Sequence, residues 1–224
     1  MRIRPAAIIF DYGNVLSEPQ PWSDVQAMAS ILDLPAETFR RVYWQFRLAY
    51  DEAALDPEAY WTTVAQAVSR RLTDSQILVL IEIDCRGWAH PAAVIPEWAR
   101  QLHRAGLRTA LLSNMPVPVR DYVSRCTWLP PFHHRTFSCD VRAAKPSVKI
   151  YRHCLNGLGV APSDVLFLDD RPENVQAAQA LGMHGVVFTT LGQAAAELDR
   201  RFDIPVPLAA TVVETQSPAR HSNR

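Results

Sequence analysis

Four widely separated sites in the chain hold polar residues of types that suit chemistry on a phosphate group. In chain order they offer a lone carboxylate, a hydroxyl beside an amide, a lysine and a pair of carboxylates. Phosphoryl transfer needs a nucleophile in line with the leaving group, a metal ion that neutralises charge, and cations or donors around the phosphoryl oxygens. The four sites are Asp11, Ser113-Asn114, Lys145-Pro146 and Asp169-Asp170.

Each of these sites has an ordinary structural explanation when it is taken alone. Asp11 could cap a turn or the following helix, and Ser113-Asn114 lies ahead of Pro116, as a turn often does. A lysine before proline is usually a solvated surface residue, and an acid pair before Pro172 suits a helix N-terminus. The ordered combination of all four, rather than any single one, indicates a functional site.

Apolar runs typical of buried strands precede three of the sites, and helical patterns separate the runs. The apolar runs cover residues 7–10, 107–112, 164–168 and 185–188. The helical patterns, each with a Gly at its end, cover residues 96–106, 147–157 and 173–182. Strands that alternate with such helices predict an α/β fold with a doubly wound, Rossmann-like parallel sheet. Because ligands bind at the carboxyl ends of the strands in such sheets, we expect the polar sites to meet there.

Residues 18–90 break this alternation and predict an all-helical insertion, or cap, after the first strand. Its helical patterns, 36–53 and 57–71, are rich in aromatic residues, most of which we expect to form the core of the insertion. The predicted domain organisation is therefore residues 1–17 and 91–204 as the α/β core, 18–90 as the helical cap and 205–224 as a disordered tail.

The composition argues against several classes of partner. The 23 basic and 23 acidic residues balance, so bulk charge does not favour binding to nucleic acid or to an anionic membrane. No apolar run approaches the roughly 20 residues of a membrane helix, and no signal-peptide cleavage site is evident. The four cysteines are scattered without a C-x-x-C pair, so we expect reduced thiols in a cytoplasmic protein. A monomer and a homodimer fit the sequence equally well.

With these motifs in this order, the chain resembles the haloacid dehalogenase (HAD) superfamily of hydrolases over residues 7–188. Its first motif, FDYGNV at residues 10–15, is similar to the FDxGNV subgroup, which includes sugar-phosphate phosphatases. The segment FLDDRPENVQAA at residues 167–178 is especially similar to the fourth motif of the family. The resemblance also implies that the helical insertion is a type-1 cap.

The resemblance implies a Mg²⁺-dependent phosphohydrolase that acts on a small phosphorylated metabolite. Asp11 would be the nucleophile that becomes an aspartyl-phosphate, and Lys145 would neutralise both the phosphate and the Asp11 carboxylate. The implied phosphate-binding residues are Ser113, Asn114 and Lys145. The implied ligands of Mg²⁺ are Asp11, the Gly13 carbonyl and Asp170, with Asp169 and Asn174 in supporting positions.

At Gly13 the sequence departs from the family pattern. Most phosphatases of the superfamily carry a second Asp there, which protonates the leaving group and later activates water. Such general acid–base help is worth about 10²–10⁴-fold in rate. Another group, such as Glu18, Glu52 or Arg47, could supply the proton, or the substrate could have a leaving group that needs little help.

Two alternative functions stay open on the sequence. One is a catalytically weak or inactive phosphate-binding or regulatory module that keeps the fold. The other is a dehalogenase-type hydrolase, whose Asp attacks carbon without a metal ion, although the pair Asp169-Asp170 argues against it. Cap residues that face the cleft would select the substrate. The candidates are Tyr43, Trp44, Arg47 and Trp61, and the sequence does not say which of them face it.

Overall fold

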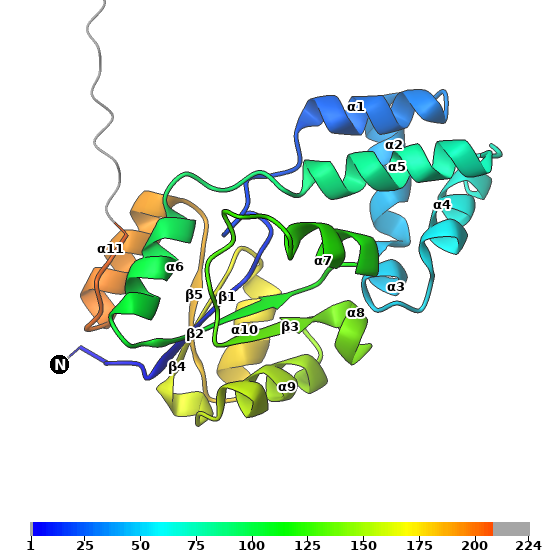
Figure 1. Ribbon diagram of the computed structural model, residues 1–224. Helices are drawn as coiled ribbons and strands as arrows, with labels where there is room; N and C mark the ends of the chain where they lie inside the picture. The colour runs from blue at the N-terminus through cyan, green and yellow to red at the C-terminus, as the bar shows by residue number, and fades with distance from the viewer. Residues whose placement is uncertain (1, 208–224) are drawn as a thin grey trace, which may run out of the picture.

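The centre of the molecule is a five-stranded sheet in which all neighbouring strands are parallel. The computed structural model describes residues 2–207. The strands are β1 (Ala7–Phe10), β2 (Arg108–Ser113), β3 (His134–Phe137), β4 (Val165–Asp169) and β5 (His184–Val187). Their order in the sheet is β3-β2-β1-β4-β5 (Figure 1). The predicted α/β fold with a Rossmann-like parallel sheet is confirmed.

The helices of the core follow the strands in alternation. The three helices predicted from the sequence are present as α6, α9 and α10, with small shifts at their ends. The elements of the core are α6 (Ile95–Arg104), α7 (Val117–Val123), α8 (Ser138–Val141), α9 (Val148–Leu158), the short 3-10 helix η1 (Pro162–Asp164), α10 (Pro172–Ala180) and α11 (Leu191–Arg201).

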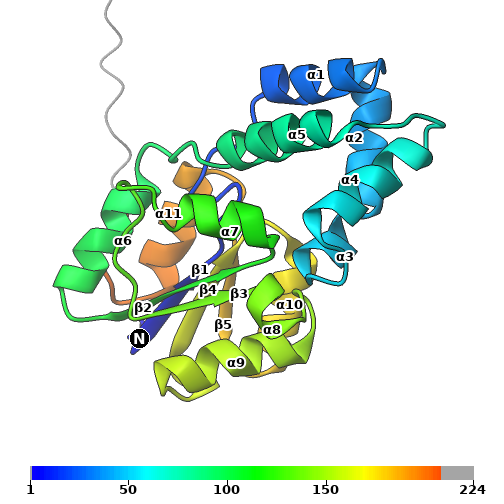
Figure 2. The ribbon, with the colours of Figure 1, turned by 45° about the vertical axis from the view of Figure 1, so that its right-hand side comes forward.

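Helices cover both faces of the sheet, which explains why β1 is apolar throughout rather than alternating. Successive side chains of a strand point to opposite faces. Accordingly, Ile8 and Phe10 enter a hydrophobic cluster with residues of α6 and α11, whereas Ala7 and Ile9 enter another with residues of α9 and α10. Figure 2 shows these two pairs of helices on opposite sides of the sheet.

The insertion between β1 and α6 consists of helices with a hydrophobic cluster of their own, built from residues between Val25 and Ile83. Two connections join it to the core, as Figure 1 shows. Its last helix starts with a capping box, in which Thr73 and Gln76 exchange hydrogen bonds between side chain and backbone. The helices are α1 (Trp22–Ile31), α2 (Ala36–Gln45), α3 (Arg47–Asp51), α4 (Pro57–Gln66) and α5 (Asp74–Gly87).

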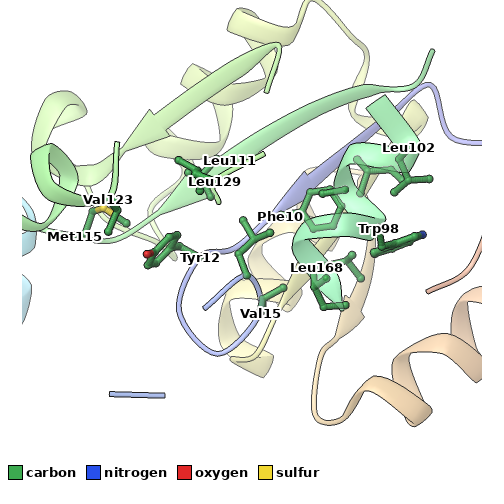
Figure 3. Packing of buried hydrophobic residues seen from close by; sticks show 14 of the residues in the cluster. Phe10, Tyr12, Val15, Trp98, Leu102, Leu111, Met115, Val123, Leu129 and Leu168 are labelled. Atoms are coloured by element: carbon green, nitrogen blue, oxygen red, sulfur yellow. The ribbon is translucent and has the colours of Figure 1, made fainter. Parts of the chain in front are cut away.

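The first cluster of the sheet also reaches the segment that follows α11. Trp98 of α6 packs edge-on against Phe10, with ring centroids 5.4 Å apart (Figure 3). Its indole Nε1 donates a hydrogen bond to the Pro205 carbonyl at 2.8 Å, so the first residue of the expected tail lies against the core. Residues 208–224 of that tail lie outside the described residues.

The cysteines and the lengths of the helices are also defined by the structure. All four cysteines are free thiols, as expected. Among residues 2–207, no helix combines the length and the apolar character that crossing a membrane requires.

Candidate active site

The predicted polar sites lie at one edge of the sheet, at the carboxyl ends of its three central strands. Asp11 directly follows β1, Ser113 ends β2, and Asp169 ends β4. The chain winds from β1 through β2 to β3 on one side and places β4 and β5 on the other, so the winding direction changes beside β1. Ligands of open α/β sheets bind in the crevice at such a point.

Lys145 reaches this edge from the loop before α9, and its ammonium group is buried between carboxylates. Nζ donates to Asp11 Oδ1 at 2.6 Å, to Asp169 Oδ2 at 2.7 Å and to the Leu112 carbonyl at 2.9 Å. These three bonds use all three ammonium hydrogens. Burial alone would lower the pKa of Lys145, but Asp11 and Asp169 raise it above the usual value, so the side chain stays charged.

The two neighbouring acids have different surroundings. Asp169 is fully buried, and its Oδ1 accepts hydrogen bonds from Asn174 Nδ2 and from the Arg171 backbone N–H, both at 2.9 Å. Its Oδ2 accepts from the lysine ammonium. Asp170 is partly exposed and lines the pocket at the site, and its Oδ2 accepts from Asn14 Nδ2 at 2.7 Å. Asp169 therefore holds Lys145, Asn174 and the Arg171 backbone in position, whereas the Asp170 side chain faces the pocket.

The donor set fits a hard divalent cation. Asp11, Asp169 and Asp170 each place a carboxylate oxygen within 4.8 Å of the others. Burial, followed by the charge of Asp169, raises the pKa of Asp11 to about 8, although Lys145 opposes the shift. Burial also raises the pKa of Asp170. A cation among these oxygens would offset their repulsion, and an all-oxygen donor set is the kind that Mg²⁺ binds.

Asn114 holds the loop that carries Lys145. Its Oδ1 accepts from the Lys145 backbone N–H at 2.8 Å, and its Nδ2 donates to the Lys145 carbonyl at 3.0 Å. One of the two amide hydrogens is thereby committed to the loop, which leaves one for a ligand. Ser113 is buried, its Oγ lies 3.5 Å from the Asn114 carbonyl oxygen, and both residues line the pocket.

The pocket lies between the core and the cap and has a volume of about 660 Å³. That volume falls in the range of about 300–1,000 Å³ that is common for small-molecule sites. Of the cap candidates, Trp44 and Arg47 line the pocket, whereas Tyr43 and Trp61 are buried within the cap. The cap residues of the lining are Trp44, Arg47, Leu48, Asp51 and Trp88.

The space beside Gly13 is taken by an indole ring. A Cβ atom built on Gly13 would lie 3.3 Å from Cζ3 of Trp88. The ring is held in place, because Trp88 Nε1 donates to the Tyr43 hydroxyl at 3.1 Å and the Trp88 carbonyl accepts from the Tyr12 hydroxyl at 2.7 Å. A carboxylate at position 13 would therefore need this ring to move.

The three residues suggested as substitute proton donors have other surroundings. Glu18 lines a second, smaller cavity, and Glu52 Oε1 accepts a hydrogen bond from the Ala144 backbone N–H at 2.8 Å. Arg47 does line the pocket at the site, but its guanidinium is buried and ion-paired with Asp51 and Asp84. Among these three residues, Arg47 alone belongs to the lining.

Sequence reasoning assigned no role to Asn14 or Trp88, although both border the site. Asn14 adopts the left-handed conformation with φ of 59°, which Asn tolerates better than most residues, and this places its amide on Asp170. The sequence Gly13-Asn14 is typical of a tight turn, so it could have indicated that Asn14 adopts the left-handed conformation. Trp88 follows the last cap helix without any local pattern that could have indicated its contact with Gly13.

Known proteins resemble the chain in sequence as well as in fold. A sesquiterpene phosphatase of Aspergillus oryzae is 26% identical over 184 residues, which cover 82% of this chain and 89% of that protein. A solved structure of a HAD family enzyme from Bacteroides thetaiotaomicron, in complex with magnesium and inorganic phosphate, has a TM-score of 0.61. The two sequences are 19% identical, and the likeness covers 83% of this chain and 93% of that one.

A dehalogenase is among the solved structures of the same fold. L-2-haloacid dehalogenase from Xanthobacter autotrophicus has a TM-score of 0.61 at 20% identity, and the likeness covers 90% of this chain and 85% of that one. At such identities the structures establish the fold alone. The haloacid dehalogenase-like hydrolase family itself matches residues 5–182, which is most of the chain. The chain therefore belongs to the haloacid dehalogenase-like hydrolase family.

Proposed function

We propose that this protein is a Mg²⁺-dependent phosphohydrolase that acts on a small phosphorylated metabolite through an aspartyl-phosphate on Asp11. The observation that carries the proposal is the fixed position of the Asp11 carboxylate. Its Oδ1 accepts hydrogen bonds from Lys145 Nζ and from the Tyr12 backbone N–H, both at 2.6 Å. Within the described residues both bonds go to Oδ1, so Oδ2 is the oxygen available to attack phosphorus.

The reaction has two displacements at phosphorus. In the first, an Asp11 oxygen forms a bond to phosphorus while the bond from phosphorus to the alcohol oxygen breaks, and that oxygen leaves with the electron pair and takes a proton from solvent. In the second, water attacks the same phosphorus and loses a proton to solvent, the bond from phosphorus to Asp11 breaks with its electron pair returning to the carboxylate, and inorganic phosphate leaves. Lys145 stays charged throughout and stabilises the phosphoryl oxygens through its charge, because its three hydrogens are already bonded within the core. Ser113 and Asn114 supply the hydrogen-bond donors.

The residues that would hold Mg²⁺ are Asp11, Asp170 and the carbonyl of Gly13. The bound ion supplies positive charge that offsets the charge on the phosphoryl oxygens. Asp169 and Asn174 act as positioning residues, because Asp169 bridges the Asn174 amide and the Lys145 ammonium.

A relative in sequence supports phosphoryl chemistry over attack on carbon. The Aspergillus protein, whose likeness covers 82% of this chain, is named a phosphatase. Asp170 supports the same choice, because a carboxylate that forms no salt bridge in the described part of the chain, beside an attacking carboxylate, would hinder a metal-free reaction. Gly13 favours one second candidate, a phosphate-binding module with little turnover, because no carboxylate stands at that position.

Hydrolysis of acetyl phosphate and of para-nitrophenyl phosphate, with and without Mg²⁺, tests the proposal. Both leaving groups depart without a strong acid, so the absence of a side chain at Gly13 does not mask activity. We expect Mg²⁺-dependent phosphate release and a labelled phosphoenzyme after acid quench. Phosphate binding without any turnover would favour the binding module, and chloride release from 2-chloropropionate without metal would favour a dehalogenase.

A further inference from the structure

The wall that the cap contributes to the pocket is largely apolar. Trp44, Leu48 and Trp88 line the same cavity as Asp11 and Lys145. The rings of Trp44 and Trp88 meet edge to face, with centroids 6.2 Å apart. The pocket thus combines a charged floor on the core with an indole-lined wall on the cap.

Two of these side chains are unusually exposed for their type. Trp44 is 48% exposed and Leu48 is 58% exposed, although most aromatic residues of the cap are buried in its interior. A single exposed apolar residue is ordinary, but clustered ones that line one cavity mark a binding surface. The cap therefore keeps apolar area in contact with water at the place that faces the phosphate site.

The charged residues of the same wall are paired with each other. Arg47 Nε donates to Asp51 Oδ1 at 2.8 Å, and its Nη1 lies 3.0 Å from Asp84 Oδ2. Arg47 is only 5% exposed, so its charge is compensated within the cap rather than presented to a ligand. A substrate that brings many hydroxyl groups to this wall would find few partners for them, which costs binding energy.

The core side of the cavity adds apolar surface to this wall. Met115 and Val119 line the pocket from the segment after β2. The indole of Trp88 lies beside Gly13, so the apolar surface continues to the turn that follows Asp11. The lining therefore changes from charged to apolar beside the proposed nucleophile.

We propose that Trp44, Leu48 and Trp88 form a leaving-group subsite for an apolar organic group, so that the substrate is the phosphate monoester of a hydrophobic alcohol or phenol. This inference rests on the proposed phosphohydrolase function. The phosphate end binds at Lys145, and the organic end displaces water from the indole rings and Leu48. Each methylene buried there improves binding by about fourfold.

A panel of four substrates with Mg²⁺ tests this subsite on the wild-type protein. Acetyl phosphate reports on the nucleophile and the metal, because its leaving group is small and activated. Glycerol 3-phosphate presents a polar alcohol, whereas 1-naphthyl phosphate and farnesyl monophosphate present an aromatic and a polyprenyl group. We expect kcat/KM for farnesyl monophosphate, an alkyl ester like glycerol 3-phosphate, to exceed that for glycerol 3-phosphate by about 100-fold or more. For 1-naphthyl phosphate, whose phenolic leaving group departs more readily, we compare KM, which should be lower than that for glycerol 3-phosphate.

Variants of the cap separate the effect of the apolar subsite from that of the catalytic and metal-binding residues. Trp44→Ala and Leu48→Ala alter exposed side chains, so we expect both to fold, which circular dichroism checks. For each, the ratio of kcat/KM for the preferred apolar ester to that for acetyl phosphate should fall about tenfold, mainly through KM. Leu78→Ala is the matched control, because Leu78 is 68% exposed on α5 and lies outside the pocket lining. It should leave this ratio unchanged.

The outcomes distinguish failure of the subsite from failure of the proposed function. If acetyl phosphate is hydrolysed but glycerol 3-phosphate is preferred over both apolar esters, the subsite is wrong and the phosphohydrolase stands. The same holds if Trp44→Ala and Leu78→Ala behave alike. If no member of the panel is hydrolysed with Mg²⁺, the proposed function fails and the subsite fails with it.

Discussion

The ammonium nitrogen of Lys145 lies 2.6 Å from Oδ1 of Asp11, although the two residues are 134 positions apart in the chain. The contact is buried, so water screens it little, and the main chain of the lysine loop is fixed through Asn114. The carboxylate is thereby oriented before any substrate arrives.

Asp11→Asn should abolish turnover and keep the fold. Asn is similar in size and its oxygen can still accept from Lys145, but an amide is no nucleophile, so we expect a loss of at least about 10³-fold. Phosphate release from acetyl phosphate measures the loss. Asp199→Asn on α11 is the control, because Asp199 is exposed. Activity near that of the control would exclude Asp11 as the nucleophile.

Lys145→Ala should lower both stability and affinity for vanadate. Without the ammonium, the buried Asp169 carboxylate loses its cationic partner, and removal of one partner of a buried pair costs about 3–5 kcal/mol. Urea unfolding and inhibition by vanadate measure the two effects. The chain has only two lysines, and the other, Lys149, is exposed, which makes Lys149→Ala a matched control. Equal stability of the two variants would contradict the assigned position of Lys145.

Binding of Mg²⁺ should release a proton near neutral pH. Burial, with the charge of Asp169, raises the pKa of Asp11 to about 8, so its carboxyl holds a proton at pH 7 in the metal-free protein. A cation favours the ionised form and expels that proton. Calorimetry in buffers of different ionisation enthalpy counts the protons, and the release should fade above pH 8. Asp11→Asn should show a smaller release, and equal release in both proteins would assign the proton elsewhere.

The same raised pKa predicts how the stability of the metal-free protein depends on pH. A carboxyl whose pKa is higher in the folded state stabilises that state below its ordinary value of about 4, and the contribution is lost as pH rises through about 8. The free energy of unfolding without Mg²⁺ should therefore fall over this range, and Mg²⁺ should restore part of it at the upper end. Urea titrations at several pH values, with Mg²⁺ or with EDTA, measure the difference.

Gly13→Asp should not raise activity on alkyl phosphates by itself. Its Cβ would lie 3.3 Å from Cζ3 of Trp88, so the indole must shift to admit the side chain, and the bond from Nε1 to the Tyr43 hydroxyl opposes that shift. In combination with Trp88→Ala, the new acid has room, and the rate on glycerol 3-phosphate should increase over that of Trp88→Ala alone, up to the 10²–10⁴-fold typical of general acid–base catalysis. A higher rate for Gly13→Asp alone would show that the indole ring of Trp88 moves easily.

The sheet was predictable where its strands are buried on both faces. Residues 7–10 and 165–168 are apolar runs because helices cover both sides, and such runs are visible in the sequence. β3 was missed because it lies at the edge of the sheet and begins with the polar residues His134 and Arg135. The predicted helix over 36–53 is divided at Phe46, where φ is −110°, and no Gly or Pro near this position signals the break in the sequence.

The candidate site was predictable on the core and not on the cap. Strand ends bring Asp11, Ser113 and Asp169 to one edge, and topology alone dictates this meeting. On the cap, helical spacing does not say which aromatic residue faces inward. Tyr43 and Trp44 are neighbours in sequence, yet the first is buried in the cap and the second lines the pocket.

The end of α3 is bonded to the same loops that hold the charged groups of the core. Glu52 Oε1 accepts from the backbone N–H of Ala144, the residue just ahead of Lys145, at 2.8 Å, and the Asp51 carbonyl accepts from Ser138 Oγ at 2.6 Å. Any hinge motion that lifts α3 must break both bonds, whereas the bonds between Asn114 and the lysine loop lie within the core. Opening of the cap would thus cost two hydrogen bonds without releasing the ammonium from Asp11, so the nucleophile stays oriented while a substrate enters.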